Sequence, residues 1–192
     1  MTGVILAGGR SSRMGVDKAT YAVAGRAMLE WVGEALDAVA HRVVVAGRAE
    51  PIGRYEALAD PGPSHQGPLA GLVAALEAYG DAVIVVATDQ PWVRPETLRQ
   101  LANRMTDLPV VPVDGGVRQT TCAVYPPTVA DAARTELDQS GSLQSLLDVV
   151  AFDPVVDWYS WGEDGRSWFS VDTPKDAEEG ISRFGSPTTP RD

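Results

Sequence analysis

The sequence has very little of what disulfide-bonded, zinc-binding or membrane-spanning proteins need. It holds one cysteine, Cys122, and two histidines, so neither a disulfide framework nor a Cys/His zinc site can form within the chain. Its most apolar run, residues 82–87, is far shorter than the ~20 residues of a membrane-spanning helix. The first residues also lack the charged start and apolar stretch of a signal peptide. These absences predict a protein of the reducing cytoplasm with no membrane partner.

Positive charge is also scarce, except near the N-terminus. The formal net charge is −10, which disfavours binding to nucleic acid or to anionic membranes through general charge. The N-terminal segment nevertheless carries four basic residues, Arg10, Arg13, Lys18 and Arg26, against one acidic residue, Asp17. A basic cluster in an acidic protein indicates a small anionic ligand.

Short apolar runs alternate with segments of helical periodicity, and glycine and proline mark the joins. This pattern is typical of an α/β protein with a mostly parallel sheet. The length suits one domain, residues 1–184, followed by a disordered tail, residues 185–192, that lacks apolar side chains. Strands are expected at residues 4–7, 43–45, 82–87, 110–113, 122–125 and 158–161, and helices at 27–40, 69–79, 95–105, 128–138, 142–150 and from Thr173 onward.

A glycine-rich loop, residues 6–18 (LAGGRSSRMGVDK), follows the first expected strand. It is not a P-loop, because five residues rather than four separate Gly9 from Gly15 and no Gly-Lys-Ser/Thr follows. It is not a dinucleotide fingerprint either, because two adjacent glycines are followed by Arg-Ser-Ser-Arg. With both motifs excluded, the sequence predicts a flexible loop that offers backbone amide donors. Arg13 and Lys18 add positive charge, and this combination suits a polyphosphate.

Residues 6–18 resemble the signature of the MobA-like nucleotidyltransferases, and within that family they most resemble the molybdenum cofactor guanylyltransferases. The similarity continues in residues 67–71 (GPLAG), in residues 89–91 (DQP) at a strand end and in residues 172–176 (DTPKD) before the last helix. The resemblance implies a single-domain, Rossmann-like fold of the nucleotide-diphospho-sugar transferase type, with three layers, α/β/α, and a mostly parallel sheet.

The resemblance also implies a reaction. GMP would pass from GTP to molybdopterin-bound molybdenum, with Mg²⁺ as cofactor and pyrophosphate as the second product. GTP and Mo-molybdopterin would be the substrates, molybdoenzymes or cofactor-carrier proteins would be transient partners, and the oligomeric state stays open. Two alternatives are also open: a molybdopterin cytidylyltransferase or other small-acceptor nucleotidyltransferase, and a non-catalytic nucleotide-binding accessory protein.

Roles follow for individual residues, and only that of Arg13 comes from charge and spacing instead of the resemblance. The expected catalytic residues are Arg13, Lys18 and Asp89; the expected nucleotide-binding residues are Leu6, Ala7, Gly8, Gly9, Lys18, Asp60, Gly67, Pro68, Leu69, Ala70, Gly71 and Asp89; and the expected metal ligands are Asp89 and Asp172. A carboxylate at the carboxyl end of a strand is a natural Mg²⁺ ligand in an open α/β sheet.

Each of these residues also has a purely structural interpretation. Asp89 could cap the turn before the following proline, and Asp60 could simply start a turn. Asp172 could belong to the cap of the last helix. The two glycines of residues 67–71 could serve helix–sheet packing, and residues 119–125, which resemble the acceptor-side strand of the family, could be an ordinary strand.

The sequence departs from the family pattern at three places, so the resemblance indicates the nucleotide donor more strongly than the acceptor. Ala46 stands where an asparagine is expected, Asp172 replaces an amide, and residues 140–143 lack an arginine often found nearby. A further question concerns a cluster of tryptophans, which could stack on a pterin, form part of the core or make an oligomer contact. Its members are Trp158, Trp161 and Trp168.

Overall fold

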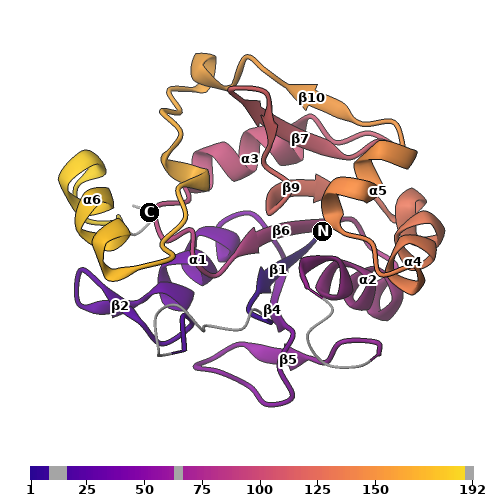
Figure 1. The fold of residues 1–192 in the computed structure, drawn as a ribbon, viewed down its shortest axis with the longest axis horizontal. Helices are drawn as coiled ribbons and strands as arrows, with labels where there is room; N and C mark the ends of the chain where they lie inside the picture. Colours follow the sequence, from indigo (N-terminus) through magenta and orange to yellow (C-terminus); the bar gives the residue numbers. More distant parts are fainter. Residues whose placement is uncertain (9–16, 63–66, 189–192) are drawn as a thin grey trace.

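The computed structural model describes residues 1–8, 17–62 and 67–188, and in this part of the chain an eight-stranded sheet forms the centre (Figure 1). Its strand order is β10-β7-β9-β6-β1-β4-β5, with β8 paired to β7. Neighbours run parallel, except that β9 is antiparallel to β6 and β7, and β8 is antiparallel to β7. The strands are β1 (Thr2–Leu6), β4 (Arg42–Ala46), β5 (Glu56–Leu58), β6 (Val83–Ala87), β7 (Val110–Asp114), β8 (Val117–Arg118), β9 (Cys122–Tyr125) and β10 (Asp153–Val155).

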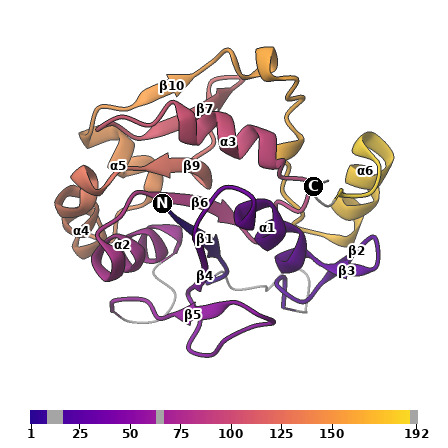
Figure 2. The same ribbon diagram turned by 180° about the vertical axis from the view of Figure 1, so that it is seen from behind.

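Helices cover both faces of the sheet (Figure 2). One face packs against α1 (Met28–Asp37) and α3 (Pro95–Asn103), and the other against α2 (Pro68–Tyr79), α4 (Ala130–Asp138) and α5 (Leu143–Val149). Side chains alternate along a strand, so Val4 and Leu6 of β1 join the second layer while Ile5 joins the first. The expected three-layer α/β/α architecture is therefore confirmed.

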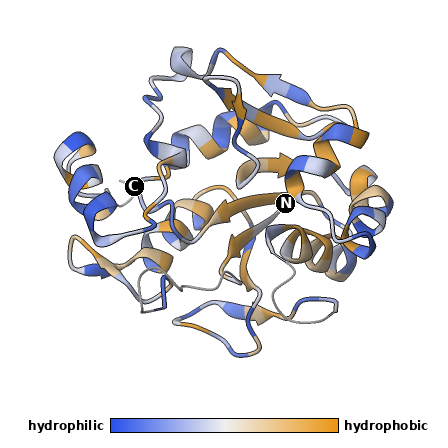
Figure 3. Ribbon diagram, in the orientation of Figure 1, coloured by the Kyte–Doolittle hydropathy of each residue, from blue (hydrophilic) through white to orange (hydrophobic). Residues whose placement is uncertain are grey.

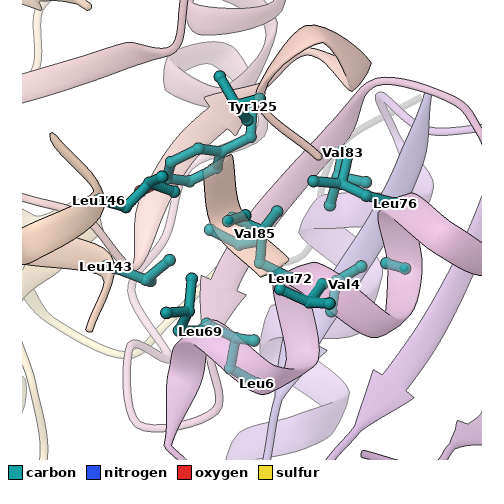
Figure 4. Packing of buried hydrophobic residues seen from close by; sticks show 14 of the residues in the cluster. Val4, Leu6, Leu69, Leu72, Leu76, Val83, Val85, Tyr125, Leu143 and Leu146 are labelled. Carbon is teal, nitrogen blue, oxygen red and sulfur yellow. The ribbon is translucent and has the colours of Figure 1, made fainter. Parts of the chain in front are cut away.

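The core beneath α2 is the largest apolar cluster, and Figure 4 shows how its side chains interlock. Leu69, Leu72 and Leu76 of α2 contact the strands, and Tyr125 of β9 closes the cluster on one side. Figure 3 shows the same contrast along the chain, with apolar residues on the central strands and on α2 and polar residues on the outer helices. Helix α2 is apolar on more than one face, because it packs against the sheet on one side and against α4 on another.

Two parts of the fold differ from expectation. No strand forms at residues 158–161, because Trp158–Trp161 is a 3₁₀ helix whose end is set by Gly162 in the left-handed region (φ +72°); the nearby strand is β10. A hairpin of β2 (Ala22–Val23) and β3 (Arg26–Ala27) was not expected. Its two-residue turn, Ala24-Gly25, has positive φ at both positions, which is the geometry of the tight hairpin turns that twist with their strands.

The C-terminal helix α6 (Pro174–Phe184) lies beside the sheet and packs on Trp92 and Phe169 (Figure 1). Within the predicted tail, the carbonyl of Gly185 accepts a hydrogen bond from the Trp92 indole at 2.8 Å. Residues 189–192 lie outside the described residues. None of the helices described here has the length and apolar character that crossing a bilayer requires.

Candidate active site

A cavity of about 320 Å³ lies at the carboxyl ends of the parallel strands β1, β4 and β6. These strands end at Leu6, Ala46 and Ala87, and all three residues line it. Ligands of open α/β sheets bind outside the carboxyl ends of the strands, so the topology points to this cavity as the binding site. Its described lining residues are Leu6, Gly8, Ala46, Gly47, Asp60, Gly67, Pro68, Gly71, Ala87, Asp89, Gln90, Thr121, Ser170 and Asp172.

Most of the residues singled out from the sequence therefore meet at one place. Those that line the cavity are Leu6, Gly8, Asp60, Gly67, Pro68, Gly71, Asp89 and Asp172. Leu69 and Ala70 do not line it; their side chains are fully buried in the core, which leaves only their backbone for a ligand. The Ala7 amide donates to the Ala46 carbonyl at 3.0 Å, joining the ends of β1 and β4. Gly9 and Arg13 lie outside the described residues.

Lys18 connects the two carboxylates that the sequence suggested as metal ligands. Its Nζ donates to Asp89 Oδ2 at 2.9 Å and to Asp172 Oδ1 at 2.6 Å, although the three residues lie up to 154 positions apart in the chain. Burial alone would lower the pKa of Lys18, but the hydrogen bonds and charges of Asp172 and Asp89 outweigh it and raise that pKa. The ammonium is therefore charged, and both carboxylates face one cation.

Backbone contacts fix the position of Asp89. The Thr88 hydroxyl and amide both donate to the Leu6 carbonyl, at 2.9 and 3.1 Å, which ties the end of β6 to the end of β1. The Asp89 carbonyl in turn accepts from the Val171 amide at 2.8 Å. This bond brings the segment that carries Asp172 next to Asp89, so the two carboxylates converge through main-chain geometry.

Asp172 is not the cap of α6. That role belongs to Thr173 and Asp176, which form a capping box in which the Thr173 hydroxyl accepts from the Asp176 amide and the Asp176 carboxylate accepts from the Thr173 amide. The Asp176 carboxylate also accepts from the Asp172 amide at 2.9 Å. The side chain of Asp172 is thereby left to face Lys18, and the interpretation of Asp172 as a capping residue is wrong.

The turn that carries Lys18 is held by an ion pair that the sequence did not suggest. Asp17 accepts from the Ala19 amide at 3.0 Å, and its carbonyl accepts from the Thr20 amide at 3.1 Å. Arg48, two residues past β4, donates to both carboxylate oxygens of Asp17 at 2.5 Å. Arg48 is therefore a positioning residue for Lys18, acting through Asp17.

If Lys18 contacts the phosphates of a nucleoside triphosphate, as the resemblance implies, replacing Arg48 by alanine should raise the KM for that substrate about fivefold with little change in kcat, since a partly exposed pair is worth about 1 kcal/mol. Arg48→Lys should restore part of the loss. Arg134→Ala is the matched control, because Arg134 pairs with Glu77 between α2 and α4. An unchanged KM in Arg48→Ala, measured by steady-state kinetics, would remove Arg48 from this role.

Two glycines build the wall of the cavity where β1 and β4 end. A Cβ on Gly47 would lie 2.4 Å from the Cα of Gly8, and Gly47 has φ +82°. Only glycine allows this backbone conformation at so close an approach without strain. A Cβ on Gly71 would meet the side chains of Ala46 and Leu6, both at 2.8 Å. Gly71 thus serves helix–sheet packing as well as lining the cavity.

On the other side of the cavity, Gln90 joins the loop after β6 to the segment before β9. Its Oε1 accepts from the Ala87 amide at 3.2 Å and its Nε2 donates to the Thr121 hydroxyl at 3.3 Å. Thr121 belongs to the stretch that resembles the acceptor-side strand, and it lines the cavity. Gln90 and Thr121 belong to stretches that resemble the family, but Gly47 and Ser170 had no sequence signal of their own.

The tryptophan cluster packs within the protein. Trp158 and Trp168 form an edge-to-face pair with ring centroids 5.1 Å apart, and their indole N–H groups donate to the Val113 carbonyl and to the Asp114 carboxylate. Trp161 packs against the same apolar cluster. None of the three is among the described lining residues of the cavity, so the structure favours a core role over pterin stacking.

The residues at the cavity fit a divalent ion that a substrate helps to bind. Within the described ranges, no group of three or more His, Cys, Asp and Glu side chains could hold a metal by itself. Asp89 and Asp172 nevertheless converge on a single cation, the Lys18 ammonium. Mg²⁺ typically takes one or two carboxylates and completes its shell with phosphate oxygens and water, so this pair of carboxylates suits it.

Comparison with known proteins identifies the family of this chain. The model of the MobA-like NTP transferase domain family matches residues 3–155. A protein named "Probable molybdenum cofactor guanylyltransferase" from Bacillus licheniformis is 33% identical over 184 residues, covering 92% of this chain and 94% of that protein. A protein of the same name from Natronomonas pharaonis is 34% identical, covering 95% and 98%.

Solved structures share the fold. Molybdopterin-guanine dinucleotide biosynthesis protein A from Archaeoglobus fulgidus superposes with a TM-score of 0.78 at 23% identity, covering 95% of this chain and 97% of that one. 2-C-methyl-D-erythritol 4-phosphate cytidylyltransferase from Thermus thermophilus superposes with a TM-score of 0.64 at 19% identity, covering 93% and 96%. Since the family model covers most of the residues and two relatives match along nearly their whole length, the chain belongs to the MobA-like NTP transferase family and is a nucleotidyltransferase.

Proposed function

We propose that this protein transfers GMP from GTP to the terminal phosphate of molybdopterin-bound molybdenum, releasing pyrophosphate. The observation that carries the proposal is the convergence of Lys18, Asp89 and Asp172 at one end of a strand-end cavity. The two relatives that match along nearly their whole length, each named "Probable molybdenum cofactor guanylyltransferase", support the choice of acceptor. The cytoplasm, which supplies GTP, is the proposed location.

The proposed reaction is an in-line displacement at the α-phosphorus of GTP. A phosphate oxygen of the acceptor forms the new bond, the bond from the α-phosphorus to the bridging oxygen breaks, and pyrophosphate leaves with that electron pair. Such a transfer depends on positioning and charge neutralisation, with no covalent protein nucleophile. The backbone at Leu6, Ala7 and Gly8 would hold the nucleotide, and the residues around Gly67 would approach it from the start of α2.

Cations neutralise the triphosphate in this proposal. Lys18 would contact the phosphates, and Arg13 would add a second positive charge. Asp89 and Asp172 would hold Mg²⁺, which when bound polarises the phosphate oxygens and stabilises the charge that develops on the leaving group. Asp60 also lines the cavity and would contact the nucleotide.

A binding titration tests the nucleotide part of the proposal without the unstable pterin. In the presence of Mg²⁺, GTP, CTP, ATP and UTP are titrated separately into the protein by calorimetry. We expect GTP to bind at least tenfold more tightly than the other three. A preference for CTP would instead support a cytidylyltransferase, and failure of all four to bind would contradict a nucleotide site at this cavity.

Turnover separates the enzyme from a nucleotide-binding accessory protein, since such a protein would bind GTP without releasing pyrophosphate when the acceptor is added. The sequence keeps Arg13, Lys18, Asp89 and Asp172 together. This combination favours the enzyme, because binding a nucleotide does not by itself need a pair of metal-binding carboxylates.

A further inference from the structure

The Lys18 ammonium occupies the position between the two carboxylates where the divalent ion would bind. It lies 2.9 Å from Asp89 Oδ2 and 2.6 Å from Asp172 Oδ1, and the side chains of Lys18 and Asp89 are 21% and 23% exposed. Mg²⁺ would need the same oxygens at about 2.0–2.1 Å. Two cations at this position would repel each other, so binding of the divalent ion favours departure of the ammonium.

We propose that Lys18 closes the metal site in the nucleotide-free protein, and that the divalent ion enters only together with a nucleoside triphosphate. This inference rests on the proposed function, because it takes Asp89 and Asp172 as metal ligands. The triphosphate offers the ammonium new anionic partners. When Lys18 moves from the carboxylates to the phosphates, the carboxylates become available to the ion that accompanies the nucleotide.

The turn that carries Lys18 is anchored, whereas the Lys18 side chain itself has several rotatable bonds. The turn at residues 17–20 is held by Asp17, which accepts from the Ala19 amide and pairs with Arg48. Beyond that fixed turn, the lysine side chain is a flexible four-carbon stem that ends in a compact charge. Rotation of the Lys18 side chain is the movement by which we expect the exchange to occur.

The exchange couples the two ligands thermodynamically. Metal alone must displace the ammonium from its two ion pairs, and nucleotide alone must draw the ammonium away from two neighbouring carboxylates. Each step is unfavourable by itself, since close carboxylates repel one another and an unpaired, partly buried charge is poorly solvated. Together the two ligands satisfy every charge, so each should raise the affinity for the other by the same factor.

Binding of Mn²⁺, followed by electron paramagnetic resonance, tests the inference on the nucleotide-free protein. We expect the native protein to bind Mn²⁺ weakly, and Lys18→Met to bind it at least tenfold more tightly. The matched control is Lys175→Met, which removes the one other lysine of the chain from an exposed position three residues past Asp172. That variant should bind Mn²⁺ like the native protein. Equal affinity of native protein and Lys18→Met would overturn the inference.

Two further variants keep the result interpretable. Lys18→Arg retains the positive charge and should still exclude Mn²⁺, and Lys18→Gln should behave like Lys18→Met if the methionine variant unfolds. Adding GTP without acceptor should raise the Mn²⁺ affinity of the native protein at least tenfold. Tight binding of Mn²⁺ to the native protein without nucleotide would also overturn the inference.

The carboxylate variants separate failure of this inference from failure of the proposed metal site. Asp89→Asn and Asp172→Asn should each weaken Mn²⁺ binding in the presence of GTP. If they do so while Lys18→Met matches the native protein, the metal site stands and the exchange does not. If neither variant affects Mn²⁺ binding, the metal site itself is wrong.

Discussion

Replacing Asp89 by asparagine is expected to lower the rate of pyrophosphate release about a thousandfold. Asparagine has nearly the same shape but no charge, so the site would lose one of its two carboxylates at the point where both face Lys18. A metal ion contributes several kcal/mol of transition-state stabilisation, and about 4 kcal/mol corresponds to a thousandfold change in rate. Nucleotide affinity should fall much less, because the backbone wall at Leu6 and Gly8 is untouched.

A coupled pyrophosphate assay with Mg²⁺, GTP and acceptor measures the rate, and a GTP titration measures affinity. Asp138→Asn is the matched control, since Asp138 lies on α4 with a side chain that is 67% exposed and only a 3.7 Å contact to Arg134. Pyrophosphate release at the native rate by Asp89→Asn would show that Asp89 is not a metal ligand.

Replacing Gly47 by alanine is expected both to destabilise the protein and to damage the cavity. The positive φ alone costs about 1–2 kcal/mol for a residue with a Cβ, and the added Cβ would lie 2.4 Å from the Cα of Gly8. Backbone must move to relieve this contact, so we expect the free energy of unfolding to fall by more than about 2 kcal/mol. GTP should bind at least tenfold more weakly, because the displaced wall is formed by Gly8.

The variant Gly25→Ala separates the effect of the positive φ from the effect of the contact between the added Cβ and Gly8. Gly25 has nearly the same φ, +81°, but a Cβ there would meet nothing within 4 Å. Urea unfolding should therefore show a smaller loss of stability for Gly25→Ala, and GTP titration should show native affinity. Equal effects of the two substitutions on both measurements would mean that the contact between Gly47 and Gly8 is unimportant.

The spacing of apolar residues within each strand and helix explains why most of the fold could be predicted from the sequence. The buried strands β1, β4, β6, β7 and β9 are short apolar runs bounded by glycine, proline or charge, and the helices after them repeat apolar residues at helical spacing. The errors lie where tertiary contacts override local pattern. Residues 158–161 look like a strand because of their aromatic residues, yet the Trp158 indole bonds to β7 and packs on Trp168, which suits a 3₁₀ turn.

Motifs single out Lys18, Asp89 and Asp172 in the sequence, and the structure places these three residues together. What the motif could not give is the pairing of these three residues with one another, because the pairing depends on the bond between Val171 and Asp89. Arg48 was missed for a similar reason. An arginine after a strand carries no signal of its own until the fold places it against Asp17.

Two departures from the family pattern, Ala46 and Asp172, change the lining of the cavity. Ala46 lines the cavity with a methyl group where an amide was expected, so this side chain offers a ligand no hydrogen bond. Asp172 contributes a charge in place of an amide and pairs with Lys18. A carboxylate attracts a divalent ion more strongly than an amide does, so this substitution strengthens the proposed metal site.

Product analysis tests the central claim most directly. The protein is incubated with Mg²⁺, Mo-molybdopterin and either GTP or CTP, and the pterin products are identified by mass spectrometry while pyrophosphate is measured in parallel. The account predicts a guanine dinucleotide form of the cofactor and pyrophosphate in equal amounts with GTP, and neither with CTP. A cytosine dinucleotide product, or no transfer from GTP by protein that binds it, would contradict the account.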